Sequence, residues 1–454
     1  MIRTFQSTLA HVWVWKWAVM PFRGSPDERC ILRYTHRRKK PISFPRKGCA
    51  CGLFICLKNM TAALFDLPPK PVFELRPCQK EAVAAGVTHM KSKNKPWIIV
   101  LPTWSWKSLV IANIIKELEG KTIVLQPSKE ILEQNFEKFA TYAPDMDVWI
   151  FSASFGKKEV KDVTFAMIGS VINNRWLFAD YHNIIIDECH YVNAKGGMYN
   201  EFIKMLEWAN VLWLTATPYR LASNSYWSML RFITRTRPRI FESVVCHSQV
   251  QDLKALWFLA DVNYYQIQGF ESSKVKANST GADYSDGSLR QYYKDINFDN
   301  SITDVVKRLV NAGRKNVLVF TRFTEEAYSL VKALWDAASI VTAETHPKQR
   351  EQLLHSFKSW KIKVMANVWV LTTWFDFPEL ETIVLARPTK SLSLYYQMVG
   401  RWIRPHKDKK ECWVVDMCEN VNRFGRVEDL HLTDTWRWKR VVKSQWRELT
   451  NVFL

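Results

Sequence analysis

A run of eleven residues, Ile98 to Ser108, has the pattern of a phosphate-binding loop in which two glycines are replaced by tryptophan. It reads Ile-Ile-Val-Leu-Pro-Thr-Trp-Ser-Trp-Lys-Ser: an apolar strand, a short loop, and the start of an amphipathic stretch. Backbone N–H groups of such a loop cradle phosphates, Lys107 can reach the β- and γ-phosphates, and Ser108 can ligate Mg²⁺. The candidate nucleotide-binding residues of the loop are Pro102, Thr103, Trp104, Ser105, Trp106, Lys107 and Ser108.

Glycine matters in this loop because the backbone uses positive φ and the phosphate lies against it. An indole at 104 or 106 would fill the space of the phosphate and strain the turn. As written, the loop is therefore expected to bind a nucleotide poorly. The alternative, a chance strand followed by Lys-Ser, is weakened by the motifs further along the chain.

Two adjacent carboxylates follow a second apolar run, 80 residues after Lys107. Asp187 and Glu188 come at the end of the expected strand 183–186, a position that suits metal-assisted hydrolysis. Asp187 can hold Mg²⁺ through water, and Glu188 can orient and deprotonate an attacking water. His190 is expected to link this pair to the next motif. Alone the pair is moderately specific, but after a phosphate-binding loop it is a strong pattern.

The third motif, Leu214 to Pro218, ends a strand with short hydroxyl residues. Thr215, Ala216 and Thr217 are expected to couple the sites, because their hydroxyls can bond the acidic pair and relay the state of the nucleotide. An ordinary strand and turn is an equally good interpretation of these residues in isolation.

The second half of the chain offers guanidinium groups in the run Gln397 to Arg404, which reads Gln-Met-Val-Gly-Arg-Trp-Ile-Arg. Arg401 and Arg404 have helical i,i+3 spacing, which predicts that they share one face. Arginines supplied by an adjacent domain can neutralise charge on a γ-phosphate in the transition state. The alternative for both is a solvated helix face. We place Gln397 with them among the candidate catalytic residues.

Short apolar runs alternate with amphipathic stretches from Phe73 onward, which predicts parallel sheets covered by helices. Strands are expected at 97–101, 122–125, 148–151, 164–168, 183–186 and 211–214, with helices such as 108–118 and 129–140 between them. A second set follows a helix at 301–312, with strands at 317–320, 340–342, 364–367, 382–385 and 413–416. The fold class is therefore α/β, with two domains in tandem.

The expected organisation has five parts. Residues 1–60 are a basic extension, either translated from upstream of a natural start at Met60 or a nucleic-acid-binding arm. The first domain covers 61–222 and the second 301–430. Between them, 223–300 is a connecting or accessory region, and its polar stretch 271–288 is interpreted as a mobile loop. Residues 431–454 form a C-terminal tail.

The charge of the chain points to a polyanionic partner. Its 454 residues are 47% hydrophobic and 24% charged, as in ordinary globular proteins, but carry a net charge of +20. Residues 1–60 contain twelve Lys and Arg against two acids, half of that excess. Such an excess most often indicates nucleic acid, although a solubilising surface is the alternative. Nine scattered cysteines disfavour a disulfide framework, and a zinc site from Cys49, Cys51 and Cys56 with Cys30 or His36 is poorly spaced.

Nothing in the sequence suggests a membrane protein. No stretch of eighteen uncharged apolar residues is present. The apolar stretch 9–22 resembles the core of a signal peptide, but Lys16 interrupts it and no small-residue cleavage site follows. We therefore expect a cytoplasmic protein.

Tryptophan is far too common in this chain. It contains 21 Trp and only 15 Gly, whereas about 7% glycine would predict roughly 32. The glycine codon GGA and the codon UGA differ by one base, and some bacterial lineages read UGA as glycine. We hypothesise that many of these tryptophans stand where the natural protein has glycine, through translation with the wrong table. The alternative is a protein genuinely rich in tryptophan.

The ordered series of motifs resembles the DEAD/DEAH-like helicases of superfamily 2, and more narrowly the RadD-like DNA-repair helicases and the helicase subunits of restriction enzymes. The resemblance covers roughly residues 73–430 and implies two RecA-like domains with an ATP cleft between them. Its departures are Trp104, Trp106, Trp374 and Trp402, where the family has glycine. Trp257 and Trp360 also stand where relatives tend to turn on glycine.

The resemblance implies further site residues. Leu75-Arg76-Pro77-Cys78-Gln79 resembles the family's adenine-reading motif, so Arg76 and Gln79 are expected at the nucleotide, and Asp376 at its ribose or elsewhere on it. Strand-backbone contacts are implied for seven residues: Ser128, Lys129, Gly169, Ser170, Thr321, Thr372 and Thr373.

The expected function is ATP-dependent movement along nucleic acid, DNA more than RNA, in repair or recombination, with Mg²⁺ as cofactor. Repair or single-strand-binding proteins are the expected protein partners. Two alternatives are an ATPase-dead relative that only binds nucleic acid, and the motor subunit of a restriction complex. Intact Lys107, Asp187, Glu188, Arg401 and Arg404 speak against the first, and the lack of an evident nuclease motif speaks against the second.

Overall fold

The computed structural model of the chain divides into two units, Met1–Glu74 and Leu75–Leu454. It describes the backbone at 30–32 and 42–44, and residues 74–92, 95–103, 105–153, 156–193, 196–223, 228–371, 375, 377–434 and 440–452. In the first unit β1 (Cys30–Leu32) pairs antiparallel with β2 (Ile42–Phe44). The basic extension and the cysteine cluster around residue 50 otherwise lie outside the described residues.

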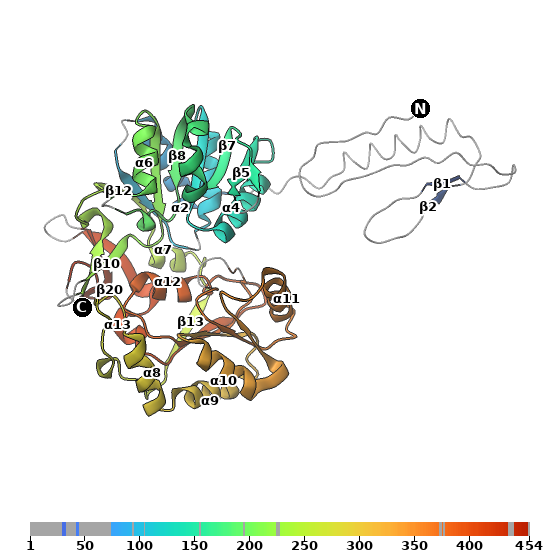
Figure 1. Ribbon diagram of the computed structural model, residues 1–454, viewed down its shortest axis with the longest axis vertical. Helices are drawn as coiled ribbons and strands as arrows, with labels where there is room; N and C mark the ends of the chain where they lie inside the picture. Colours follow the sequence, from blue (N-terminus) through green and yellow to red (C-terminus); the bar gives the residue numbers. More distant parts are fainter. Residues whose placement is uncertain are drawn as a thin grey trace. The chain divides into compact units, whose positions relative to one another are not determined.

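An eight-stranded sheet forms the first lobe of the second unit (Figure 1). Its strand order is β12-β3-β9-β8-β4-β7-β5-β6, and every pair is parallel except β5 with β6. The strands are β3 (Trp97–Val100), β4 (Lys121–Gln126), β5 (Val148–Ser152), β6 (Lys157–Lys158), β7 (Val163–Met167), β8 (Tyr181–Ile186), β9 (Asn210–Thr215) and β12 (Ser243–His247).

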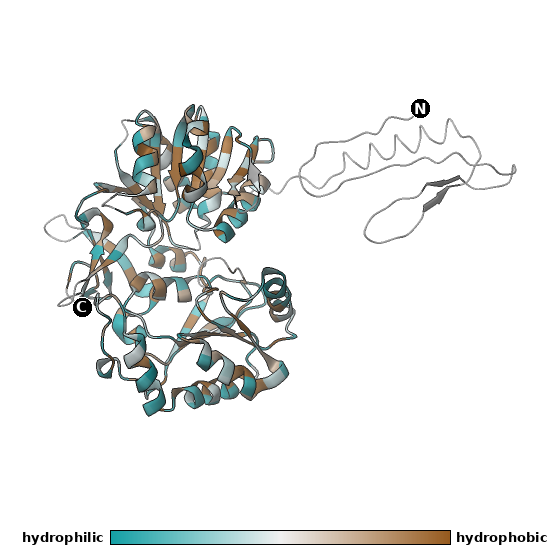
Figure 2. Cartoon of the chain, in the orientation of Figure 1, coloured by the Kyte–Doolittle hydropathy of each residue, from teal (hydrophilic) through white to brown (hydrophobic). Residues whose placement is uncertain are grey.

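Helices cover both faces of this sheet, because neighbouring residues of each strand point to opposite sides. Ile99 and Val124 pack with one set of helices, α2 (Pro77–Lys91), α3 (Lys107–Lys116) and α4 (Lys129–Tyr142). Ile98 and Ile123 pack on the other side against α5 (Ile168–Val171), η2 (Ile172–Phe178) and α6 (Met198–Met205). Figure 2 shows the apolar residues gathered in the strands between these layers.

The second lobe has a six-stranded parallel sheet of order β13-β18-β17-β14-β16-β15. Its strands are β13 (Asp261–Gln266), β14 (Val317–Thr321), β15 (Ala338–Val341), β16 (Val364–Asn367), β17 (Thr382–Ala386) and β18 (Glu411–Asp416). One face packs on α8 (Asp286–Asp295), α9 (Phe298–Asn311) and α10 (Thr324–Leu334). The other packs on α7 (Val250–Ala255), α11 (Pro347–Lys358), α12 (Leu392–Gly400) and α13 (Asn420–Phe424). Two tandem α/β domains were expected, and this is confirmed.

The region between the two expected domains contributes a strand to each sheet. We expected 223–300 as a separate connecting region, but β12 pairs with β3 and β13 pairs with β18. Both are edge strands in which no residue is fully buried. Their apolar runs are short and end in polar residues, so they lack the long apolar run by which central strands are recognised.

Two expected irregular segments also carry regular structure. The stretch 271–288, interpreted as a mobile loop, holds η5 (Ser272–Lys274), a bridge between Ala277 and Tyr284, and the start of α8. The side chain of Asn278 accepts the N–H of Ala282, a turn that composition alone does not reveal. The expected tail contains an antiparallel sheet of β19 (Leu430–Asp434), β20 (Arg440–Ser444) and β21 (Arg447–Glu448), and β10 (Tyr219–Ser223) pairs antiparallel with β11 (Ser228–Phe232).

Among the tryptophans that the structure describes, five have a left-handed backbone, and all five side chains are exposed. Such positive φ values favour glycine and strain a side chain as large as tryptophan. The φ angles are 53° at Trp106, 59° at Trp257, 46° at Trp335, 64° at Trp360 and 65° at Trp369.

Two of these tryptophans end helices in the manner of glycine. After α7 the N–H of Phe258 bonds to Leu253 O at 2.9 Å and that of Trp257 to Lys254 O at 3.0 Å, a Schellman motif with Trp257 at C′. Trp360 has the same place after α11, and after α9 it is Gly313 that has it. These positions behave as the glycine hypothesis expects.

Trp402 is different, because its φ is not left-handed. Its side chain is fully buried, and its indole N–H has no hydrogen-bond partner within the part of the chain that the structure describes. A buried N–H group without a partner lowers the free energy of unfolding, so glycine at 402 would remove this desolvation penalty rather than a backbone strain. Trp104 and Trp374 lie outside the described residues.

Candidate nucleotide-binding cleft

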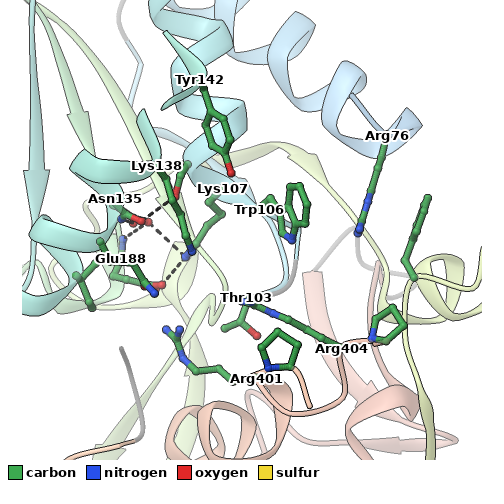
Figure 3. A pocket seen from close by; sticks show the side chains of 17 residues that line it. Arg76, Thr103, Trp106, Lys107, Asn135, Lys138, Tyr142, Glu188, Arg401 and Arg404 are labelled. Atoms are coloured by element: carbon green, nitrogen blue, oxygen red, sulfur yellow. Dashed lines mark hydrogen bonds and ion pairs between the residues drawn. The ribbon is translucent and has the colours of Figure 1, made fainter. Parts of the chain in front are cut away.

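The loop between β3 and α3 has the geometry of a phosphate cradle. It leaves the carboxyl end of β3 and enters α3 at Lys107, so the first N–H groups of the helix face the loop. The buried hydroxyl of Ser105 donates to Pro102 O at 2.7 Å. The N-cap of α3 is Trp106 at φ 53° and ψ 55°, and its indole reaches into the cavity in front of the loop (Figure 3).

Lys107 meets both carboxylates of the acidic pair. Its ammonium bonds to Glu188 Oε1 and lies 3.3 Å from Asp187 Oδ1. Burial raises the pKa of Asp187, and Lys107 offsets this only in part. Burial also acts to raise the pKa of Glu188, but Lys107 and then His190 lower it overall, so this carboxyl stays ionised. A charged carboxylate beside a cation can accept a proton from water or position it.

Asn135 on α4 connects Ser108 to the acidic pair. The hydroxyl of Ser108 donates to Asn135 Oδ1 at 2.7 Å, and Asn135 Nδ2 donates to Asp187 Oδ2 at 3.4 Å. The hydroxyl, amide and carboxylate oxygens are the ligands that Mg²⁺ prefers, and the ion usually keeps several bound waters as well. Ser108 and Asp187 thus fit the ion that we expected there.

His190 joins the acidic pair to the third motif, as predicted. Its Nδ1 lies 2.9 Å from Thr215 Oγ1, 3.1 Å from Thr217 Oγ1 and 3.2 Å from Glu188 Oε2. The hydroxyl of Thr215 also points to Glu188 Oε2, at 3.5 Å, and accepts the N–H of Thr217 at 3.0 Å. A change at Glu188 therefore reaches the end of β9 through two side chains. Ala216 lies buried between the two threonines.

Both lobes line one cavity of about 270 Å³. Lys107, Asp187 and Glu188 come from the first lobe, while Arg401 and Arg404 come from the second. In Figure 3 the guanidinium of Arg401 points toward Glu188, and the side chain of Arg404 extends toward Thr103. The expectation that Arg401 and Arg404 share a helix face is wrong. Helix α12 ends at Gly400, with Arg401 as its C-cap, so Arg404 reaches the cavity from an irregular turn.

Arg76 lies at one end of the cavity, with its guanidinium 4.0 Å from the ring centroid of Phe258 and 5.2 Å from that of Trp106. Gln79 is buried and does not line the cavity: its amide donates to Ser105 O at 2.8 Å and accepts the N–H of Arg76 at 2.8 Å. The structure therefore places Gln79 as a brace between α2 and the phosphate loop. Gln397 likewise lies outside the cavity and bonds the hydroxyl of Tyr191.

The expected strand-contacting residues lie elsewhere on the two lobes. Ser128 caps α4 by accepting the N–H of Ile131, and Lys129 beside it is exposed. Ser170 accepts the N–H of Ala153 at 3.3 Å, and the space around Gly169 is open. The expectation that the side chain of Thr321 contacts the nucleic-acid strand is wrong. Thr321 is fully buried and its hydroxyl donates to Phe323 O, so that hydroxyl is not available to a nucleic-acid strand.

Thr372, Thr373 and Asp376 lie outside the described residues. Sequence reasoning also missed several side chains that line the cavity. Asn135, Lys138 and Tyr142 lie on one face of α4, at the i, i+3 and i+7 spacing that could have identified them. Phe258 carried no such signal, because its position depends on the turn after α7.

Comparisons with known proteins agree with this geometry. Residues 72–220 match the family described as "Type III restriction enzyme, res subunit", and residues 301–406 match "Helicase conserved C-terminal domain". A 51.5 kDa protein of a Lactococcus phage is 24% identical over 77% of this chain and 71% of its own length. The helicase-like protein IRC3 of Saccharomyces cerevisiae is 24% identical over 75% of this chain, which spans only 51% of that protein. The DNA 3'-5' translocase XPB2 of Sulfurisphaera tokodaii is 23% identical over 77% of this chain and 82% of its length.

Two solved structures share the fold. A fragment of an HsdR subunit of a type I restriction enzyme from Vibrio vulnificus superposes with a TM-score of 0.58 at 20% identity, covering 87% of this chain and 75% of that one. The Type ISP restriction-modification enzyme LlaBIII, bound to DNA, superposes with a TM-score of 0.54 at 16% identity, covering 75% of this chain and 27% of that one. Among the described residues no helix is long and apolar enough to cross a membrane.

Proposed function

We propose that this chain, which belongs to the superfamily-2 helicases and is related to restriction-enzyme helicase subunits, hydrolyses ATP between its two lobes to move along DNA. One observation carries the proposal. Lys107, Asp187 and Glu188 of the first lobe and Arg401 and Arg404 of the second line the same cavity. Hydrolysis that needs groups from both lobes necessarily couples chemistry to their relative position.

Each group has a distinct task in this proposal. Lys107 and the N–H groups at the start of α3 bind the phosphates, and Glu188 orients the attacking water and accepts its proton. Arg401 and Arg404 balance the charge that develops on the transferred phosphoryl group. Ser108 and Asp187 hold Mg²⁺, which supplies further charge neutralisation when bound.

The coupling path begins at Glu188. When the charge at this carboxylate changes, its contacts with His190 and Thr215 must rearrange, and Thr217 follows because it shares both partners. β10 begins two residues after Thr217, so the path leads directly into the hairpin of the first lobe. In this proposal the DNA strand lies across both lobes and is held by its phosphates. DNA binding should therefore tolerate any base sequence and weaken as the salt concentration rises.

DNA rather than RNA is the proposed substrate, in keeping with the DNA translocase among the relatives. The proposed role of this activity is in DNA repair or recombination, where the chain would act alongside single-strand-binding proteins. With tryptophan at 106 the chain should bind ATP poorly, because the indole of Trp106 lines the cavity directly in front of the loop that would hold the phosphates. Activity is therefore expected from the chain with glycine restored at 104, 106, 374 and 402, called the restored chain below.

The test is ATP hydrolysis by the restored chain with single-stranded, duplex and forked DNA and with RNA. We expect stimulation by DNA and its loss in Lys107→Ala. Equal turnover in Lys107→Ala and its parent would refute the assignment. Turnover absent from every variant, with DNA binding intact, would favour the ATPase-dead alternative.

A motor subunit of a restriction complex is the second candidate, because the match at 72–220 is to a restriction-enzyme family. The two candidates differ in the preferred strand. A restriction motor should be stimulated most by uninterrupted duplex DNA, whereas a repair helicase should prefer forks or single strands.

A further inference from the structure

Three neighbouring strands of the second sheet end at one edge, and each is followed by a side chain that meets the others. β14 lies between β17 and β16, and all three run parallel. Their carboxyl ends therefore coincide, which brings together Arg387 after β17, Arg322 after β14 and Trp369 after β16. Ligands of open α/β sheets bind at this edge.

Arg322 and Arg387 are both buried, but only Arg322 has a partner at each of its three nitrogens. Its Nη1 donates to Asp283 Oδ2 at 2.7 Å, and its Nε and Nη2 donate to Asp286 Oδ1 at 3.1 and 2.8 Å. Arg387 is 1% exposed, and its Nε and Nη2 have no hydrogen-bond partner among the described residues. Burial, and then the charge of Arg322, lower the pKa of Arg387 to about 9.

The indole of Trp369 covers this guanidinium. The carbon at the centre of the Arg387 guanidinium is 3.1 Å from the ring centroid of Trp369, and that of Arg322 is 5.3 Å away. Residue 369 has a φ of 65°, where glycine is free of strain. Glycine at 369 would uncover Arg387 without changing the course of the backbone.

The strand end that carries Arg387 is held firmly. Asn420 Nδ2 donates to Arg387 O at 3.1 Å, and Asn420 Oδ1 accepts the N–H of Thr389 at 3.1 Å. Asp416 accepts a second hydrogen bond from Asn420 Nδ2, also at 3.1 Å. A binding group on such a support is oriented before its ligand arrives.

We propose that Arg387 binds a phosphodiester oxygen of the nucleic-acid strand, and that the indole of Trp369 blocks this contact in the chain as written. A guanidinium with two unpaired nitrogens, Nε and Nη2, matches the geometry of a phosphate. The carboxylates nearby are engaged by Arg322, and Arg387 is not among the residues that line the nucleotide cavity, so the phosphate of a strand suits it better than that of ATP. The proposal rests on the proposed function, because it presumes that this edge meets a strand.

The test is a double-mutant cycle on the restored chain, with Trp369→Gly and Arg387→Gln singly and together. Binding of a fluorescein-labelled oligothymidylate is measured without nucleotide over a range of salt concentrations. With glycine at 369, Arg387→Gln should weaken binding about tenfold, as for loss of one hydrogen bond to a charged group, and lower the salt slope by about 0.7, the value for one phosphate of a single strand. With tryptophan at 369, Arg387→Gln should change neither quantity.

Three controls make the result decisive. Arg308→Gln removes the same charge from the exposed surface of α9 and should leave the slope unchanged in both backgrounds. Arg387→Lys keeps the charge and should restore the slope, which a merely structural role would not predict. ATP affinity should be equal with and without Arg387→Gln; a loss there would assign the site to the nucleotide and overturn the proposal.

Equal effects of Arg387→Gln in both backgrounds would also overturn the proposal. The proposed function fails differently, since then no variant of the restored chain would bind the oligonucleotide or be stimulated by DNA.

Discussion

Comparing glycine with alanine at Trp257 tests whether the backbone itself demands glycine. Both substitutions remove the same indole, which is 82% exposed, so the loss of side-chain contacts cancels in the comparison. What remains is the backbone, which has a φ of 59° at the C′ position of α7.

The magnitude follows from two opposing effects. Alanine in the left-handed region costs about 1–2 kcal/mol. A chain with glycine at this position is more flexible when unfolded, and this lowers the free energy of unfolding by roughly 0.4–1 kcal/mol relative to alanine. We therefore expect Trp257→Gly to be more stable than Trp257→Ala by about 1 kcal/mol, or about 2–4 °C in Tm for a cooperative unit of 150–250 residues.

Two matched positions give the assay its controls. Trp208 is 60% exposed without a left-handed φ, so there alanine should be the more stable by roughly 0.4–1 kcal/mol. Gly313 occupies the same C′ position after α9, and Gly313→Ala should lose about as much as separates the two Trp257 variants. Thermal unfolding followed by circular dichroism measures all five variants. The same sign at 257 and 208 would refute the reasoning.

Further predictions concern the cleft. Lys107→Ala in the restored chain should lower ATP turnover about 100- to 1,000-fold, measured as phosphate release, because Glu188 and the phosphates lose one shared cation. His190→Ala should abolish stimulation by DNA while leaving basal hydrolysis within about threefold, a difference that a turnover assay with and without DNA resolves, and equal loss of both rates would contradict the coupling path. Outside the cleft, burial is the main cause that lowers the pKa of Lys409 from 10.5 to about 8. Between pH 8 and 10.5 the unfolded chain therefore binds one more proton at this residue than the folded chain, so the free energy of unfolding should rise with pH. Denaturant titrations should show this rise in the parent but less of it in Lys409→Met.

Central elements were predictable from the sequence because their signals are local. The expected strands 183–186 and 317–320 contain the apolar runs Ile-Ile-Ile and Val-Leu-Val-Phe, as expected of strands buried on both faces, and the structure extends each by only one or two residues. The two motifs, each placed at the carboxyl end of a strand, were predictable as well, and the structure brings Lys107 to Asp187 and Glu188 although β9 lies between β3 and β8.

Other features depend on distant contacts and escaped sequence reasoning. β13 was missed because as an edge strand it alternates polar residues with apolar ones and becomes recognisable only beside β18. Thr321 was expected at the strand because its segment resembles a family motif, but the end of β14 turns its hydroxyl inward, where it donates to Phe323 O. The contact between the Trp369 ring and the Arg387 guanidinium brings together residues that follow two different strands of the second sheet, so no spacing along the sequence could have predicted it.

The most direct test of the account is single-turnover ATP hydrolysis by the restored chain with Arg401→Ala. Arg401 is supplied by the second lobe, so its loss should slow the chemical step about 1,000-fold or more while ATP affinity falls less than about tenfold. An unchanged rate of hydrolysis would contradict the claim that the nucleotide is bound and cleaved between the two lobes.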